Sequence, residues 1–138
     1  MPLSHLIKSL LLALMCASLV GCSHSTHEVQ VEHLLKTTHA WEGTPYYTYP
    51  AGQPEISVLK ITLPPNTPLK WHTHPIPNVA YVLSGELLVE TKAGKKKALK
   101  PGQVLPEVVN ILHRGTSGNG PVELIVFYAG SVGTPLSK

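Results

Sequence analysis

The stretch WHTHPIPNVAYVLSGEL, residues 71–87, decides how the chain is interpreted. His72 and His74 are separated by one residue, so in an extended strand both side chains point to the same face. Pro75 and Pro77 then impose a bend, and Asn78 opens an apolar run on the returning strand. We therefore expect His72, His74 and Asn78 to approach one point, where imidazole nitrogens and an amide oxygen can bind a metal ion.

A third histidine lies well downstream of this stretch. His113 ends the segment PEVVNILH, which begins at Pro106. A third imidazole from a distant strand would complete a set of ligands on one side of an ion and leave positions open for a substrate. Glu107 precedes His113 by an even number of residues, so both would share one face of an unbroken strand.

Short apolar runs bounded by proline and glycine fill most of the chain after residue 50. The sequence contains 13 prolines and 11 glycines, and helical periodicity over more than ten residues is missing after the N-terminal apolar segment. This punctuation predicts an all-β sandwich or barrel. The predicted strands are 56–63, 79–83, 86–91, 96–99, 103–105 and 122–128, and a strand is favoured over a helix for 28–41.

These motifs resemble those of the cupin family. Its first motif is a His-x-His, a Glu four or five residues on, and a Gly seven residues later; His72, His74 and Gly85 match this spacing, and Asn78 takes the Glu position. Its second motif is matched by Gly102 and His113 but lacks the usual proline and glycine. The resemblance covers roughly residues 56–128 and implies a single cupin-type β-barrel, a jelly roll also called a double-stranded β-helix.

The resemblance implies a divalent transition metal held by His72, His74 and His113. Asn78 is a neutral and weaker ligand than Glu, so a dication would keep an uncompensated charge unless Glu107 turns inward. The ligand set is therefore three histidines with Asn78, with Glu107 as an alternative carboxylate. The sequence does not select among Fe, Zn, Ni, Cu and Mn. The alternative is a cupin that has lost its metal and kept a polar pocket.

Charge excludes some functions. The net charge is +3, and the cluster Lys95-Lys96-Lys97 adjoins Gly94, which is typical of a solvated hairpin tip. We therefore expect no nucleic-acid partner. All eight acidic residues are Glu, so a Ser-His-Asp triad is excluded, although a Glu-containing variant is not.

The N-terminus has the layout of an export signal. Lys8 precedes the apolar run LLLALMCASLV, residues 10–20, which is shorter than the roughly 20 residues that span a bilayer. The run ends in Leu19-Val20-Gly21-Cys22, which resembles a bacterial lipobox with Cys22 as the lipidated residue. An ordinary signal peptide, with Cys22 incidental, is the alternative.

The expected domains are a removed lipoprotein signal peptide over 1–21, a tether and N-terminal segment over 22–40, and a cupin domain over 41–138. The mature chain would then be anchored by acyl chains such as palmitate on the periplasmic side of the envelope. Ser23 after the lipidated residue resembles the signal for the outer membrane.

Two functions remain open from the sequence. One is a metal-dependent enzyme of dioxygenase, isomerase or lyase type that acts on a small molecule. The other is a non-catalytic module that binds a small molecule or a metal at the membrane surface. Homodimerisation is implied by the resemblance, because many small cupins pair edge strands and so cover an exposed sheet edge.

Overall fold

The computed structural model describes residues 28–138, so the signal peptide and Cys22 lie outside the described residues. Residues 33–138 form one compact unit, and the described residues 28–32 belong to another. The described part of the chain has no helix long and apolar enough to cross a membrane.

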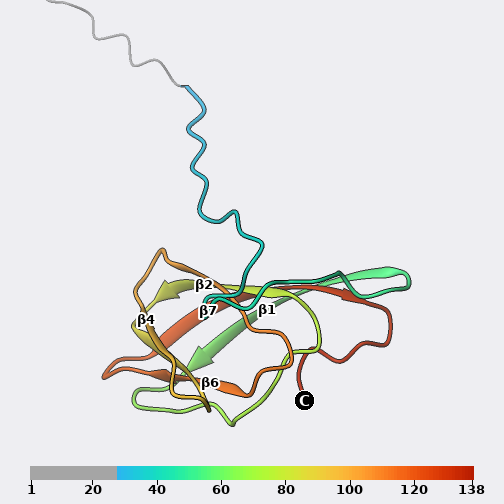
Figure 1. Ribbon diagram of the computed structural model, residues 1–138. Coiled ribbons are helices and arrows are strands. Elements are labelled where there is room, and N and C mark those ends of the chain that lie inside the picture. The colour runs from blue at the N-terminus through green and yellow to red at the C-terminus, as the bar shows by residue number, and fades with distance from the viewer. Residues whose placement is uncertain (1–27) are drawn as a thin grey trace, which may run out of the picture. The chain divides into compact units, whose positions relative to one another are not determined.

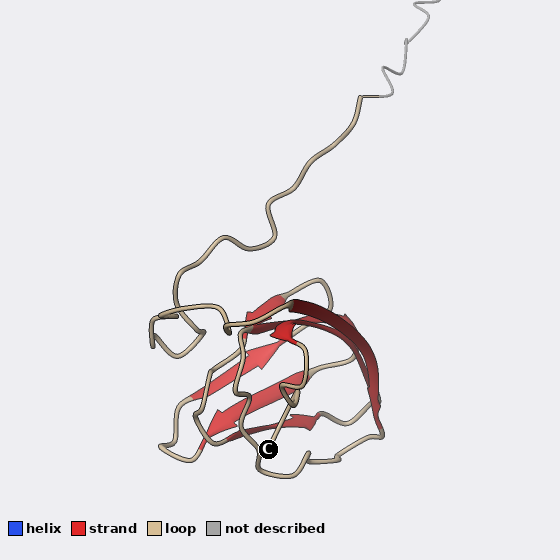
Figure 2. Cartoon of the chain, turned by 90° about the vertical axis from the view of Figure 1, so that its right-hand side faces the viewer, coloured by secondary structure: helices blue, strands red, loops and turns tan. Residues whose placement is uncertain are grey.

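Antiparallel strands build residues 33–138 into two sheets (Figure 1). One sheet has the order β1-β7-β2-β5 and the other has the order β4-β3-β6. The described strands are β1 (Pro54–Leu63), β2 (Asn78–Ser84), β3 (Leu87–Thr91), β4 (Lys96–Leu99), β5 (Val104–Pro106), β6 (His113–Ser117) and β7 (Val122–Ser131). Figure 2 shows the strands curving around a common interior. The prediction of an all-β barrel is confirmed.

Alternation along the strands places one set of side chains in the core. In β7, buried residues alternate with more exposed ones from Val122 to Tyr128, and β2 follows the same pattern. Burial of the apolar members stabilises the fold, at roughly 25 cal/mol for each Å² removed from water. The core consists of Leu63, Ile76, Ala80, Val82, Leu87, Val89, Leu99, Leu105, Val122, Leu124, Val126 and Tyr128.

Two expectations about strands were wrong. Residues 28–38 form no strand, and His39 makes only an isolated bridge to Pro45. Strand β6 was not among the predicted strands, and its residues His113–Ser117 are mostly polar or small. Pairing with β3 makes this segment a strand despite its weak apolar pattern.

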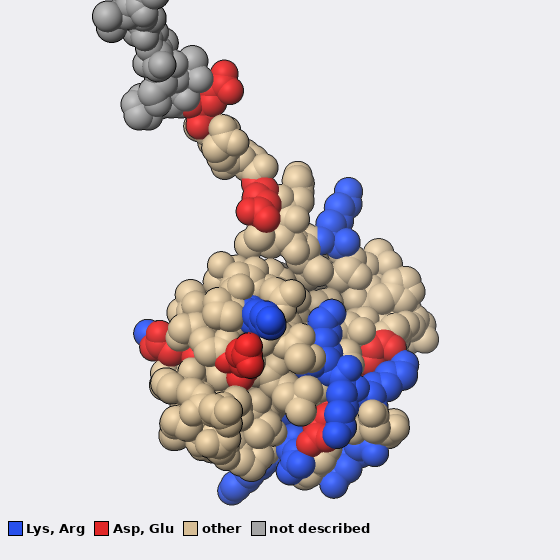
Figure 3. Space-filling view, turned by 90° about the vertical axis from the view of Figure 1, so that its left-hand side faces the viewer, with Lys and Arg blue, Asp and Glu red and all other residues tan. Residues whose placement is uncertain are grey.

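The basic cluster lies at the hairpin between β3 and β4, and its three lysines are exposed. Lys96 lies 3.8 Å from the Glu90 carboxylate, and Lys95 lies 3.7 Å from that of Glu42. Figure 3 shows acidic side chains lying among the basic ones on this face. These lysines therefore belong to a mixed surface, as the hairpin interpretation predicts.

Candidate metal centre

Backbone pairing brings the three histidines of the motifs together. His72 and His113 exchange both backbone hydrogen bonds, each of 3.0 Å, so their side chains lie on one face. His74 is bridged to Val109 and accepts a bond from the amide of Asn110. The segment that carries His72 and His74 therefore runs beside the start of β6, although its contacts are isolated bridges.

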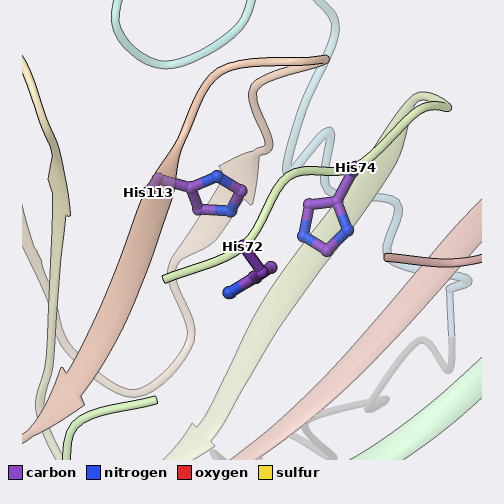
Figure 4. A group of neighbouring side chains, drawn as sticks. All are labelled: His72, His74 and His113. Atoms are coloured by element: carbon purple, nitrogen blue, oxygen red, sulfur yellow. The ribbon is translucent and has the colours of Figure 1, made fainter. Parts of the chain in front are cut away.

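The three imidazole rings face one another (Figure 4). Their centroids lie 4.4 Å apart for His72 and His113, 4.8 Å for His72 and His74, and 5.0 Å for His74 and His113. One ligand nitrogen from each ring lies within 4.8 Å of the others. The three histidines thus lie together, as the motif spacing predicts.

Each ring is oriented by a backbone carbonyl at its Nδ1. The Nδ1 atoms of His72, His74 and His113 lie 2.8, 2.7 and 2.8 Å from the carbonyl oxygens of Lys70, Leu136 and Ile111. A carbonyl oxygen only accepts, so each Nδ1 carries a hydrogen, and in a neutral ring the lone pair is then on Nε2. This is the tautomer of a histidine that binds a metal through Nε2, with its orientation set by the partner at Nδ1.

Burial keeps two of these rings neutral. Burial lowers the pKa of His74 to about 4, and the charges of His113 and His72 also lower it, while the bond to Leu136 opposes the shift. Burial likewise lowers the pKa of His113. Because a metal binds the neutral imidazole, protons compete little for these nitrogens near neutral pH.

Three buried polar residues, two in the four-stranded sheet and one directly after its strand β5, lie side by side. Asn78 pairs with Tyr128 of β7, and on its other side the Glu107 amide donates to the Asn78 carbonyl oxygen at 2.9 Å. Tyr128, Asn78 and Glu107 are all buried. The Tyr128 ring lies 5.7 Å from the His74 ring, centroid to centroid. These three residues therefore lie beside the histidines.

Three polar atoms in this region are buried without a hydrogen-bond partner: Asn78 Oδ1, Glu107 Oε2 and His113 Nε2. Glu107 Oε2 lies 3.4 Å from His113 Nε2. Burial raises the pKa of Glu107 to about 8. Unpaired buried acceptors are rare and costly in folded proteins, and a cation satisfies several at once. The residues present therefore fit a divalent metal ion.

A cavity of about 50 Å³ adjoins this cluster and has the three histidines, Glu107 and Tyr128 in its lining. The rest of its wall is mainly aliphatic: Ile61, Leu69, Ala80, Leu87, Val89, Leu124 and Val126. One water molecule occupies about 30 Å³ of liquid volume. The cavity thus has room for an ion and a very small ligand.

The structure corrects two details of the sequence reasoning. Asn78 does not return beside the segment of His72 and His74, because β2 belongs to the opposite sheet. Glu107 and His113 do not share an unbroken strand either: β5 ends at Pro106, β6 begins at His113, and Asn110 between them has a φ of 57°. Glu107 meets His113 because Glu107 directly follows β5 of one sheet and His113 begins β6 of the other.

Other residues of interest lie as follows. Tyr128 was not considered as a site residue, although alternation from Val122 along β7 places it inward. Arg114 is not a free surface residue, because it pairs with Glu90 at 2.8 Å and lies over the Trp71 ring. His33 and His39 are exposed and apart from the cluster, and His24 and His27 lie outside the described residues.

Comparison with solved structures supports the fold. A cupin-like protein from Thermotoga maritima is 18% identical with a TM-score of 0.53, over 60% of this chain and 62% of that chain. The DMSP lyase DddQ from Ruegeria pomeroyi is 19% identical with a TM-score of 0.53, over 68% of this chain and 45% of that chain. The chain thus spans only part of the length of these proteins, and at such identity the likeness concerns the fold alone.

Among curated proteins, none matches the sequence. The family model described as "Cupin domain" matches residues 59–128, a range that includes His72, His74, Asn78, Glu107, His113 and Tyr128. This match agrees with the two-sheet β-barrel and with the histidine spacing. The chain belongs to the cupin family.

Proposed function

We propose that the protein binds one divalent transition metal ion through Nε2 of His72, His74 and His113. The observation that carries this proposal is the set of three Nδ1 hydrogen bonds to backbone carbonyls, which direct three lone pairs toward one another. A core that needed only apolar packing would not keep His74 and His113 buried with these lone pairs facing each other.

The bound ion would supply Lewis acidity or, with a redox metal, electron transfer. The chain's own residues contribute orientation and a largely apolar surrounding. Backbone carbonyls fix the three rings, and aliphatic side chains and the Tyr128 phenol line the same cavity. Such a site is compatible with a dioxygenase, an isomerase or a lyase that acts on a small molecule.

Metal analysis of purified protein tests the proposal. We expect about one metal ion per chain after reconstitution, and a loss of at least tenfold in metal content in His72→Ala and in His113→Ala, since each removes a ligand. His33→Ala is the matched control, because His33 is exposed and apart from the cluster. Equal metal content in all four proteins would contradict the proposal.

A second candidate is a non-catalytic metal-binding module, which the small cavity favours. A cavity of about 50 Å³ is well below the roughly 150 Å³ that holds benzene in a protein core. An organic substrate would therefore have to displace part of the wall. Turnover of a small molecule that disappears in His72→Ala and survives in His33→Ala would exclude this candidate.

We also propose that the chain is exported and anchored through Cys22 on the periplasmic side of the envelope, with Ser23 favouring the outer membrane. Support comes from the sequence of residues 8–23. Metabolic labelling with a radioactive or clickable palmitate should mark the wild type and not Cys22→Ser. Equal labelling of both would contradict the anchor, and secretion without labelling would indicate an ordinary signal peptide.

A further inference from the structure

Resting on the metal binding proposed above, we propose that Glu107 supplies the carboxylate ligand of the metal centre in place of Asn78. The position of Asn78 is where the family pattern has Glu, and an amide there brings no negative charge. Asn78 Nδ2 donates to the carbonyl oxygen of Ile76 at 3.3 Å, which ties the amide to its own turn. A carboxyl group, which the motif lacks at Asn78, is instead supplied by Glu107, whose backbone amide bonds to Asn78.

Among the described residues, the Glu107 carboxylate has no Lys or Arg partner. In residues 28–138, Glu90 pairs with Arg114 and Glu123 pairs with Lys60, whereas no Lys or Arg lies within 4.0 Å of Glu107. Its Oε2 is buried and unpartnered. A buried carboxylate without a cation is costly, and the neutral imidazole of His113 brings a lone pair rather than a charge.

One divalent ion satisfies both groups. Glu107 Oε2 and His113 Nε2 lie 3.4 Å apart, and both are unpartnered. Two ligands of a tetrahedral ion with bonds of about 2.0–2.1 Å lie about 3.3 Å from each other. The separation of the two atoms is thus that of neighbouring ligands on one ion. A carboxylate ligand would also reduce the net charge of the buried centre from +2 to +1.

The backbone of Glu107 is held on two sides. Its amide donates to Asn78 O at 2.9 Å, and its carbonyl oxygen accepts a hydrogen bond from the Tyr46 hydroxyl. Glu107 also follows directly after β5, whose Leu105 and Pro106 are buried. These contacts keep the carboxylate inside the barrel before an ion arrives, which lowers the ordering cost of binding.

Zn²⁺ titration of the full-length, chelator-treated protein by calorimetry tests the inference. We expect Glu107→Gln to weaken Zn²⁺ binding about 100-fold or more, beyond the 10–100-fold typical for a residue that only supports a ligand. Asn78→Ala should weaken it less than about tenfold. Glu90→Gln, which removes a carboxylate paired at the protein surface, is the matched control and should bind Zn²⁺ like the wild type.

The thermal midpoint gives a second readout that is independent of any activity. Without metal, Glu107→Gln should melt at or above the wild-type temperature, because burying a neutral amide avoids the cost of burying a carboxyl group. Its rise in midpoint with Zn²⁺ should be smaller than that of the wild type, while Asn78→Ala keeps most of the rise. Equal Zn²⁺ affinity in Glu107→Gln and wild type, or a larger loss in Asn78→Ala, would overturn the inference.

Failure of this inference is distinguishable from failure of the proposed function. A wild type that binds no metal ion removes the metal centre altogether. A wild type that binds Zn²⁺ and loses it in His72→Ala, but not in Glu107→Gln, keeps the three-histidine centre and removes the role of Glu107.

Discussion

At the residue scale, burial sets the charge of the site. Burial raises the pKa of Glu107 from its usual 4.5 to about 8 and lowers that of His74 from 6.5 to about 4. In the metal-free protein both groups are therefore neutral near pH 7. Neutral groups avoid the cost of a buried charge, and the same groups become a negative carboxylate and neutral imidazoles when an ion binds.

The shift of Glu107 predicts a pH dependence of stability in the metal-free protein. Between pH 4.5 and 8 the unfolded chain has lost the Glu107 proton while the folded chain keeps it, so the free energy of unfolding falls as pH rises. The slope approaches about 1.4 kcal/mol for each pH unit. The Glu107→Gln variant should lack this contribution to the slope. Urea unfolding at several pH values, with chelator present, measures the free energy of unfolding of both proteins.

The range from pH 7.5 to 8 comes closest to isolating this effect. From about pH 7.5 upward His74 is neutral in the folded chain and about nine-tenths or more neutral in the unfolded chain, because its pKa is about 4 in the folded chain and 6.5 when unperturbed. Below pH 6.5 His74 acts in the opposite direction and stability falls as pH falls. If the wild type and Glu107→Gln show the same slope from pH 7.5 to 8, the Glu107 carboxyl is ionised in the folded protein.

At the scale of elements, the turn after β2 depends on one glycine. Gly85 has a φ of 79°, and a Cβ there would collide with the carbonyl oxygen of Pro121. This turn joins β2 of one sheet to β3 of the other, so it fixes how the two sheets face each other. The positive φ and the lack of space for a Cβ explain why this position of the family motif is a glycine.

Gly85→Ala should lower the free energy of unfolding by at least about 2 kcal/mol, from backbone strain and the collision with Pro121 together. Gly94→Ala is the matched control: its φ of 90° is strained for alanine as well, but a Cβ there meets nothing within 4 Å. Its cost should be about 1 kcal/mol. Chemical denaturation compares the two variants, and equal losses would show that the collision with Pro121 is relieved by movement.

At the scale of the whole molecule, β1 is an edge of its sheet, and within residues 28–138 no strand pairs with the outer side of this ten-residue strand. Ile56 and Val58 of β1 are 58% and 57% exposed, and Phe127, the cross-strand partner of Val58, is 41% exposed. Long apolar edges invite pairing with a second chain. The homodimer expected from the family resemblance would cover this edge and the adjacent apolar side chains.

Light scattering after size exclusion tests this expectation. The wild type should have the mass of a dimer, and Val58→Lys should shift the mass toward that of a monomer, because a charge would be buried at the interface. Leu88→Lys is the control, since Leu88 is 38% exposed and belongs to β3 of the other sheet. A monomeric wild type, or a dimer unchanged by Val58→Lys, would contradict the expectation.

The local pattern of the sequence was enough to predict most of the strands and the shared face of His72 and His74. Period-two alternation and proline and glycine boundaries identified most strands because these features depend on neighbouring residues. The spacing of His72 and His74 identified one face of a strand in the same way. The segment 28–41 and β6 escaped this reasoning because pairing with a neighbouring strand, rather than local preference, decides whether such residues form a strand.

The tertiary structure alone decided which residues complete the site. Glu107 meets His113 across the interior although the chain between them is irregular, and Tyr128 joins them from a strand that contains none of the histidines. The same structure left Asn78 Oδ1, Glu107 Oε2 and His113 Nε2 buried without partners. The need for a cation follows from burial of these atoms, and burial is a property of two packed sheets that no single strand of the sequence possesses.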